Sequence, residues 1–268
     1  MSPRNAATSE IDRWSPEVAR TLAEKVGRPI RRYFRAELHG RELLPVSGGA
    51  LLVSNHSGGM FTPDIFLFAP PFYEHFGYSR RLYTLGHDTI FIGPLRDWLP
   101  RAGVVHATRD NATEALQRGA VVLVFPGGDH DSYRPTSASN VIDFNGRTGY
   151  VRTALEAGVP IVPMVSVGGQ ETQLFLTRGR WLAQRLGLNR ARMEALPITV
   201  GFPFGLSMFI PPNLPLPVKI VTQLLPPVDI AAEFGAEPKI DEVDAHIRDR
   251  MQIALNELAR RRKFPIIG

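Results

Sequence analysis

Three short, continuously apolar runs stand out from a mixed pattern of apolar and polar positions along the chain. They are residues 50–54 (ALLVS), 120–125 (AVVLVF) and 161–167 (IVPMVSV). Runs of this length predict strands that are covered on both faces, as in a parallel sheet. Apolar patterns at 81–85, 103–106 and 218–224 predict three further strands.

Helical periodicity lies between these runs. Ser15-Pro16-Glu17 has the order of an N-cap, a first-turn proline and an acidic residue, and it predicts a helix start. Residues 65–68, 111–118 and 149–156 predict helices, the last two closed by glycine. A final helix has one apolar face, formed by Val243, Ile247, Met251, Ala254 and Leu258.

Alternating strands and helices predict an α/β fold with a mixed, mostly parallel sheet flanked by helices. Residues 1–36 are expected to form an N-terminal helical segment. Residues 37–268 are expected to form a single domain whose core motifs lie between 50 and 170. No internal repeat or low-complexity linker divides the chain.

The amino-acid composition limits the kinds of site and partner that the chain can have. The 268 residues contain no cysteine, which excludes disulfides, thiolate metal sites and a cysteine nucleophile. The net charge is +5, and Lys accounts for four of the 31 basic residues, so the rest are Arg. Guanidinium groups bind phosphates bidentately, and the candidate partners are lipid headgroups, coenzyme A and nucleic acid. No nucleic-acid recognition module is legible, so nucleic acid is not expected as a partner.

Polar, glycine-rich clusters follow the three strongest strands. They read NHSGG from Asn55, FPGGDHD from Phe125 and VGGQET from Val167. Ligands of open α/β sheets bind beyond the carboxyl ends of the strands, so these loops are expected to face one crevice. His56 is the candidate general base, because an imidazole can remove a hydroxyl proton near neutral pH. Asp64 is the nearest acid to it, and the alternative is that both residues cap a helix.

The motifs NHSGGMFTPD, FPGGDHDSYRP and EAGVPIVPMVSVGGQET, in this order, resemble those of the glycerolipid (PlsC-like) acyltransferase superfamily. The similarity extends over about residues 37–229, and the branch it resembles is the one grouped with monoacylglycerol and diacylglycerol acyltransferases. The resemblance implies transfer of an acyl group from acyl-CoA, or from an acyl carrier protein thioester, to a lipid hydroxyl. It implies a lysophospholipid, monoacylglycerol or glycolipid acceptor, and no cofactor besides acyl-CoA as substrate.

The resemblance also implies roles for individual residues. The family pairs its catalytic His with an Asp in an H-x4-D motif, but Phe61 stands at that position here. We expect Asp64 to take the role, with Asp129 or Asp131 as alternatives. The family's FPEG signature reads FPGG, so Gly128 replaces its Glu, and Arg134 and Arg147 follow at a distance. The expected substrate-binding residues are Ser57, Gly58, Gly59, Gly127, Gly128, Asp129, Arg134 and Arg147.

Two other functions remain open at this point. One is a lipid-binding protein of the same fold with weak or absent catalysis, suggested by the missing Asp at position 61. The other is a metallophosphoesterase built on Gly128-Asp129-His130-Asp131 with His87, Asp88 and His106, although no metal site is expected. No G-x-S-x-G elbow, nucleotide-binding P-loop or dinucleotide fingerprint is present.

The chain is expected to work in the cytoplasm, peripherally at the inner face of the membrane. It has no secretory signal and no uninterrupted apolar stretch that could span a bilayer. Residues 195–218 carry no charge and contain six prolines, with Phe202, Phe204, Leu206, Met208, Phe209 and Ile210 as candidates for bilayer contact. The alternative is that this stretch is internal. Arg28, Arg31, Arg32 and Arg35 form a second candidate for membrane contact.

Overall fold

The computed structural model describes residues 9–59, 63–188, 195–208, 211–262 and 264. Within them, seven strands form one sheet in the order β1-β10-β6-β2-β5-β3-β4, and three form a second sheet in the order β7-β8-β9. The strands are β1 Glu37–His39, β2 Ala50–Ser54, β3 Leu82–Gly86, β4 Val104–His106, β5 Val121–Val124, β6 Ile161–Val167, β7 Leu174–Thr177, β8 Ile198–Gly201, β9 Gly205–Ser207 and β10 Val221–Leu224.

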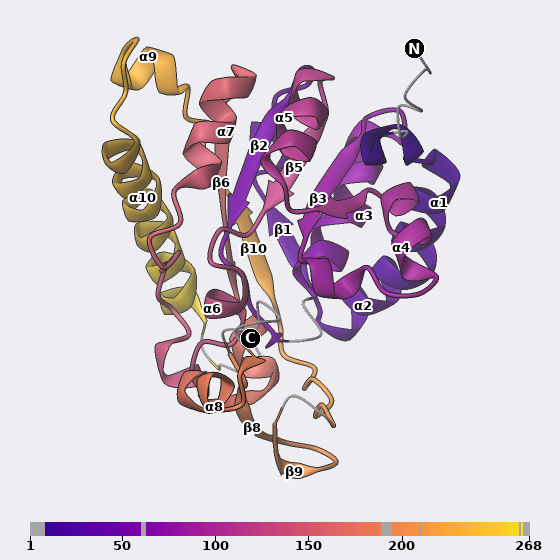
Figure 1. The fold of residues 1–268 in the computed structure, drawn as a ribbon, viewed down its shortest axis with the longest axis vertical. Coiled ribbons are helices and arrows are strands. Elements are labelled where there is room, and N and C mark those ends of the chain that lie inside the picture. The colour runs from indigo at the N-terminus through magenta and orange to yellow at the C-terminus, as the bar shows by residue number, and fades with distance from the viewer. Residues whose placement is uncertain (1–8, 60–62, 189–194, 209–210, 263, 265–268) are drawn as a thin grey trace.

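Helices cover both faces of the large sheet (Figure 1). Helices α1 to α4 lie on one side, and α5, α7 and α10 lie on the other. The helices are α1 Pro16–Leu22, α2 Arg28–Tyr33, α3 Asp64–Phe76, α4 Leu95–Trp98, α5 Arg109–Gln117, α6 Gly128–Ser132, α7 Gly149–Ala157, α8 Arg180–Arg185, α9 Ile230–Phe234 and α10 Ile240–Arg261.

The central strands are apolar except for Ser54 and Ser166, because both faces of these strands are buried. Along β2, Ala50 and Leu52 enter the core beneath α1 and α3, and Leu51 and Val53 enter the core beneath α5, α7 and α10. Successive side chains of a strand point to opposite faces, so one continuous apolar run supplies both cores. This arrangement confirms the predicted α/β fold and the strands at 50–54, 120–125 and 161–167.

The sheet is mixed, as predicted. Strand β2 pairs in parallel with β5 and β6, and β3 pairs in parallel with β5 and β4. The last strand, β10, is antiparallel to β6, and β1 runs parallel to β10. The carboxyl ends of β2 to β6 therefore meet at one edge of the sheet, where the glycine-rich loops begin.

Local signals explain several helix ends. The Ser15 hydroxyl accepts a hydrogen bond from the Val18 N–H, which caps α1 as its sequence predicts. Helix α7 ends at Gly158, whose φ of +66° is the left-handed conformation that favours glycine. Helix α5 begins at Arg109, before the predicted start at 111, because Thr108 caps it through the Asn111 N–H.

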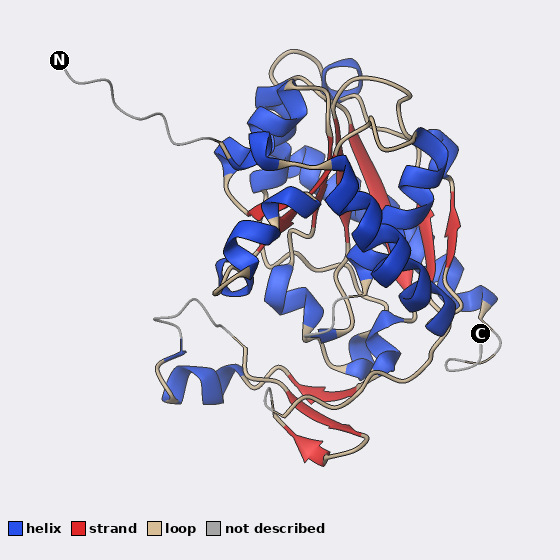
Figure 2. Ribbon diagram, turned by 90° about the vertical axis from the view of Figure 1, so that its right-hand side faces the viewer, coloured by secondary structure: helices blue, strands red, loops and turns tan. Residues whose placement is uncertain are grey.

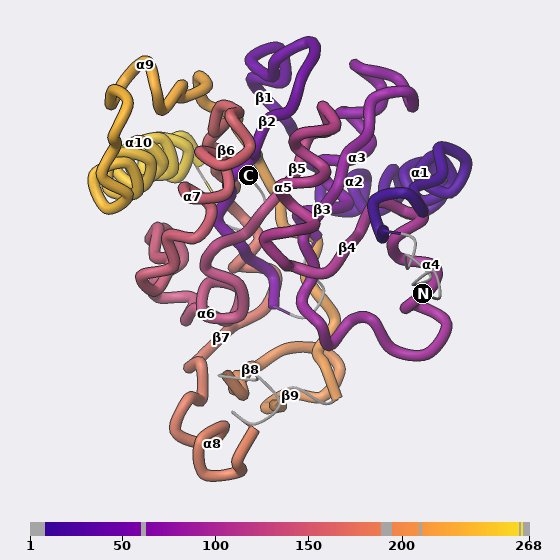
Figure 3. The backbone as a smooth tube through the Cα atoms, turned by 45° about the horizontal axis from the view of Figure 1, so that its top comes forward, coloured from indigo at the N-terminus to yellow at the C-terminus, as the bar shows by residue number. Residues whose placement is uncertain are grey.

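The second sheet is the main feature that the apolar pattern did not predict. It lies beyond the carboxyl edge of the large sheet, with α8 at the same end of the molecule (Figures 1 and 2). Strands β8 and β9 fall inside the uncharged residues 195–218 and form an antiparallel pair. Figure 3 shows β7 entering this sheet next to α6, and the Arg178 Nε donates to the His130 carbonyl at that point, 2.8 Å away.

Candidate active site

His56 lies two residues beyond the end of β2, at the carboxyl edge of the parallel strands. The preceding Asn55 is buried, and its side-chain amide makes two hydrogen bonds with the backbone of Ser166 on β6. The Asn55 Nδ2 donates to the Ser166 carbonyl at 2.9 Å, and the Ser166 N–H donates to Asn55 Oδ1 at 2.8 Å. The segment that carries His56 is therefore fixed to the neighbouring strand.

A carboxylate holds one nitrogen of the His56 ring. His56 Nδ1 lies 2.8 Å from Asp64 Oδ2, and Asp64 is the first residue of α3. Asp64 also accepts hydrogen bonds from the Ser57 N–H at 3.0 Å and from the Ser57 hydroxyl at 3.2 Å. A carboxylate at Nδ1 favours the tautomer that carries its proton there and leaves Nε2 as the acceptor.

A buried ion pair holds the backbone of His56. Asp131 Oδ2 accepts from the His56 N–H at 2.5 Å, and Arg134 Nη2 donates to the His56 carbonyl at 3.4 Å. Asp131 and Arg134 are 0% and 1% exposed and pair with each other. Burial raises the pKa of Asp131, while the Arg134 charge and the His56 N–H act in the opposite direction.

An aromatic ring supports the imidazole from one side. The ring of Phe125 stacks on His56 with a centroid separation of 4.3 Å. The sequence places Phe125 at the start of FPGG, but its contact with His56 depends on the pairing of β2 with β5. Stacking and the Asp64 hydrogen bond together restrict the orientation of the ring, whose exposed fraction is 14%.

The glycines after His56 occupy a crowded turn. Gly58 and Gly59 have φ values of +83° and +60°. A Cβ atom on Gly59 would lie 2.7 Å from the ring of Phe175 on β7. These positions require glycine for conformation and for close approach of the second sheet.

The FPGG loop lies against Arg147. Gly128 has a φ of +50°, and a Cβ there would lie 2.7 Å from Arg147 Nη1. Arg147 Nη1 donates to the Gly127 carbonyl at 2.9 Å, and its Nη2 lies 3.4 Å from Asp129 Oδ1. The Arg147 and Asp129 side chains are 38% and 24% exposed, so this pair stands at the rim of the site.

The structure changes the interpretation of three candidates, Arg134, Asp131 and Asp129. Arg134 is buried beneath His56 with its guanidinium bound to Asp131 and to the Val141 carbonyl, so it does not present a charge to a substrate phosphate. Asp131 binds the His56 backbone N–H, and Asp129 lies beside the Arg147 side chain at the rim of the site. The carboxylate that contacts the His56 ring is therefore Asp64. Phe61 lies outside the described residues.

The side chains of the phosphoesterase hypothesis are bound elsewhere. His130 Nε2 lies 2.9 Å from Asp143, His87 bonds to Thr89, and His106 Nδ1 lies 2.6 Å from Glu10. Among the residues that the structure describes, no three His, Cys, Asp or Glu side chains gather as a metal site would require.

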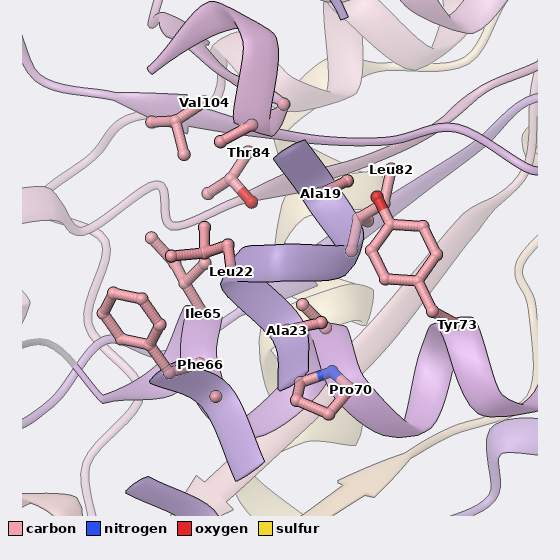
Figure 4. A pocket seen from close by; sticks show the side chains of 14 residues that line it. Ala19, Leu22, Ala23, Ile65, Phe66, Pro70, Tyr73, Leu82, Thr84 and Val104 are labelled. Carbon is pink, nitrogen blue, oxygen red and sulfur yellow. The ribbon is translucent and has the colours of Figure 1, made fainter. Parts of the chain in front are cut away.

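A small cavity lies beside α3, and His56 is not among the residues that line it (Figure 4). It has a volume of about 20 Å³ and is lined mostly by apolar groups of α1, α3, β3 and β4, such as Ile65, Phe66 and Leu82. A space of this size holds about one water molecule, and an acyl chain does not fit into it.

None of the helices among the described residues has both the length and the apolar composition needed to cross a bilayer. The predicted N-terminal basic cluster is partly engaged within the protein. Arg28 pairs with Glu74, Arg31 donates to the Leu67 carbonyl, and Arg35 donates to the Pro217 carbonyl at 2.9 Å.

Comparisons with known proteins agree with this geometry. A model of the acyltransferase family matches residues 35–167, which include β2, His56, Asp64 and the FPGG loop. The crystal structure of a 1-acyl-sn-glycerophosphate acyltransferase, PlsC from Thermotoga maritima, superimposes with a TM-score of 0.54 over 90% of this chain and 81% of that chain, at 18% identity. The family match and the sequence relatives, together with this shared fold, support assignment of the chain to the glycerolipid acyltransferase superfamily.

Relatives within this superfamily are longer. A Bos taurus protein named DGAT1/2-independent enzyme synthesizing storage lipids is 28% identical over 229 residues, which cover 82% of this chain and 61% of the bovine protein. An uncharacterized protein of Mycobacterium tuberculosis is 29% identical over 251 residues, covering 90% of this chain and 68% of that protein. The chain therefore spans about three fifths to two thirds of their lengths.

Proposed function

We propose that this acyltransferase moves a fatty acyl group from acyl-CoA, or from an acyl carrier protein thioester, to a hydroxyl of a lipid acceptor. The observation that carries the proposal is the 2.8 Å contact between His56 Nδ1 and Asp64 Oδ2 at the carboxyl edge of the sheet. No hydrogen bond within the described residues occupies His56 Nε2. This nitrogen is thus the one that meets the acceptor.

The reaction follows from this geometry. His56 Nε2 takes the proton of the acceptor hydroxyl as its oxygen attacks the thioester carbonyl carbon. Asp64 stabilises the imidazolium that forms, through the Nδ1 proton. The tetrahedral intermediate then expels the thiolate, which recovers the proton from Nε2 and leaves as a thiol.

Backbone N–H groups in the glycine loops are the proposed oxyanion donors. The His56 N–H is bound to Asp131 and the Ser57 N–H to Asp64, so neither serves this role. Within the NHSGG loop, Gly58 and Gly59 remain as the donors that we assign to the oxyanion. Ser57 is therefore a support for Asp64 rather than a substrate contact.

An acceptor without a phosphate fits the site best. Burial removes Arg134 from the surface, and the rim contributes Arg147 beside Asp129. We assign Arg147 to a phosphate of the donor and propose a monoacylglycerol or glycolipid acceptor ahead of a lysophospholipid. The name of the bovine relative says that it synthesizes storage lipids, and we take this as support for an acceptor without a phosphate.

The lipid-binding alternative loses its main support. It rested on the missing Asp at position 61, and Asp64 contacts the His56 ring at hydrogen-bond distance. Acyl transfer is therefore the proposal, with acyl-CoA as a substrate and no further cofactor. We also propose peripheral contact at the inner face of a membrane, where long-chain acceptors reside.

The proposal is tested by thioester release from acyl-CoA with monoacylglycerols, glycolipids and lysophospholipids as acceptors. We expect turnover with at least one uncharged acceptor, and we expect His56→Ala to lower it by about 10²–10⁴-fold because the general base is lost. Circular dichroism checks that the variant is folded. Equal turnover in folded His56→Ala would refute the assignment of the base, and release with no acceptor of the panel would favour a lipid-binding protein.

A further inference from the structure

The second sheet has two faces of opposite character. Its register places Leu174, Val200 and Leu206 in one row across the three strands and Phe175, Thr199 and Ser207 in the next. Neighbouring rows point to opposite faces. The row of Phe175 is buried, at 2%, 4% and 8% exposure, whereas Leu174 and Leu206 are 47% and 69% exposed.

The polarity of this sheet is inverted. Its buried face contains hydroxyl groups, with Thr199 Oγ1 and Ser207 Oγ 3.1 Å apart. The amide of buried Asn213 donates to Ser207 Oγ and to the Gly205 carbonyl, both at 2.9 Å. An antiparallel sheet with one face in water ordinarily buries its apolar side chains and exposes its polar ones.

Apolar side chains continue beyond the outer row. We define the outer apolar face as Leu174, Leu176, Phe202, Phe204, Leu206 and Met208, all of which are exposed. Phe209 and Ile210, which were also predicted to contact a bilayer, lie outside the described residues. A set of exposed apolar side chains gathered on one small sheet is typical of a site that contacts a protein or a membrane. The exposure contradicts an internal role for the middle of residues 195–218.

The positive charge of the segment around the second sheet indicates whether a protein or a membrane fits this surface. Residues 172–228 contain five Arg, one Lys and a single acidic residue, so this fifth of the chain accounts for the whole net charge of +5. Trp181 on α8 and Leu186 directly after it are each 59% exposed, next in sequence to Arg180 and Arg185. Cationic residues around an apolar, aromatic surface match an anionic bilayer, whereas a second copy with the same charge would be repelled.

The buried face of the sheet connects this surface to His56. Phe175 packs against Gly59 in the loop that follows His56, and the Arg178 Nε donates to the carbonyl of His130 on α6. The proline-rich segment between β9 and β10 is held by the Tyr33 hydroxyl, which donates a hydrogen bond to the Pro215 carbonyl at 2.7 Å. The sheet thus has one face on the reaction site and the other open to the surroundings.

We propose that the outer apolar face docks into the interface of an anionic bilayer and brings the mouth of the site to the acceptor lipid. The role of the docked lipid as acceptor rests on the proposed acyl transfer, but the docking itself does not. The inverted sheet is thereby explained, because the bilayer supplies an apolar partner for side chains that the described part of the chain leaves exposed.

The test is flotation of the full chain with vesicles, without substrate. The probes are vesicles of phosphatidylcholine alone and of phosphatidylcholine with phosphatidylglycerol. We expect binding to the anionic vesicles and a loss of roughly tenfold in partitioning for Leu206→Asp, because one apolar side chain no longer enters the interface. Ile253→Asp on α10 is the matched control, since Ile253 is 68% exposed and the charge change is the same. Phe202→Asp is the second variant if Leu206→Asp does not fold.

Acyl transfer to a dispersed acceptor and the oligomeric state are measured as well. Transfer to a dispersed short-chain acceptor should be unchanged in Leu206→Asp, so a chain that floats with vesicles but transfers no acyl group would retain the docking surface and refute the proposed function. The docking proposal is overturned if wild type ignores anionic vesicles, or if Leu206→Asp and Ile253→Asp bind alike. It is also overturned if wild type is a dimer that Leu206→Asp converts to a monomer, since a second copy would then cover the face.

Discussion

His56 receives its direction from contacts on three sides. Asp64 binds the ring at Nδ1, Phe125 stacks on its face, and Asp131 binds its N–H. Each contact limits a different freedom of the side chain or backbone, so the ring is already ordered before the proposed reaction begins.

The Asp64 contact makes a prediction at the same scale. Asp64→Asn preserves size but removes the negative charge that stabilises the imidazolium. We expect kcat to fall by roughly 10²-fold, with little change in the KM of the acceptor. Steady-state kinetics on both substrates measures this. Asp97→Asn, an exposed carboxylate on α4, is the control. A silent Asp64→Asn together with a damaging Asp129→Asn would move the orienting role to the rim.

Asp131 of helix α6 and Arg134, two residues after its end, support the site from beneath. Asp131→Asn leaves the buried Arg134 without its counter-charge, and removal of one partner of a buried pair costs about 3–5 kcal/mol. We expect the free energy of unfolding to fall by about that amount and kcat to fall with it, because the His56 backbone loses its anchor. Thermal or denaturant unfolding measures the first effect.

Asp129→Asn is the matched control for this second prediction. It is the same substitution on the same helix, but its ion pair with Arg147 is partly exposed and is worth about 0–1 kcal/mol. A free energy of unfolding that is as low in Asp129→Asn as in Asp131→Asn would contradict the role of the buried pair. A stable Asp131→Asn with normal kcat would contradict it equally.

The elements differ in how far the sequence predicts them. Strands β2, β5 and β6 are continuous apolar runs, and their glycine-rich loops indicate the site, because both faces of these strands are buried in the sheet. Strands β7 to β9 escape prediction because their outward side chains are apolar and prolines interrupt the segment. The Asp131–Arg134 pair also escapes prediction. Only the folding of α6 and the residues after it beneath the β2 loop brings this pair to His56.

At the scale of the whole molecule, the candidate active site lies between the large sheet and the outer apolar face of the second sheet. The parallel strands fix His56, and the second sheet contacts the same loop through Phe175 while it exposes its other face. If that face docks on lipid, acceptors in a bilayer and acceptors in solution reach the same catalytic groups by different routes. The two routes differ in their dependence on the basic residues around the second sheet.

The dependence of the transfer rate on salt concentration distinguishes these two routes. Screening acts over about 10 Å at 0.1 M and about 3 Å at 1 M, so salt weakens attraction between exposed Arg side chains and an anionic bilayer. With acyl-CoA saturating, we expect added salt to lower transfer to a long-chain acceptor in anionic vesicles by several-fold, and to leave transfer to a dispersed short-chain acceptor nearly constant. Vesicles of phosphatidylcholine alone should show low and salt-independent rates. Equal salt dependence for both acceptors would place the Arg residues on the donor's phosphates, and a rate indifferent to both salt and lipid charge would contradict docking on an anionic bilayer.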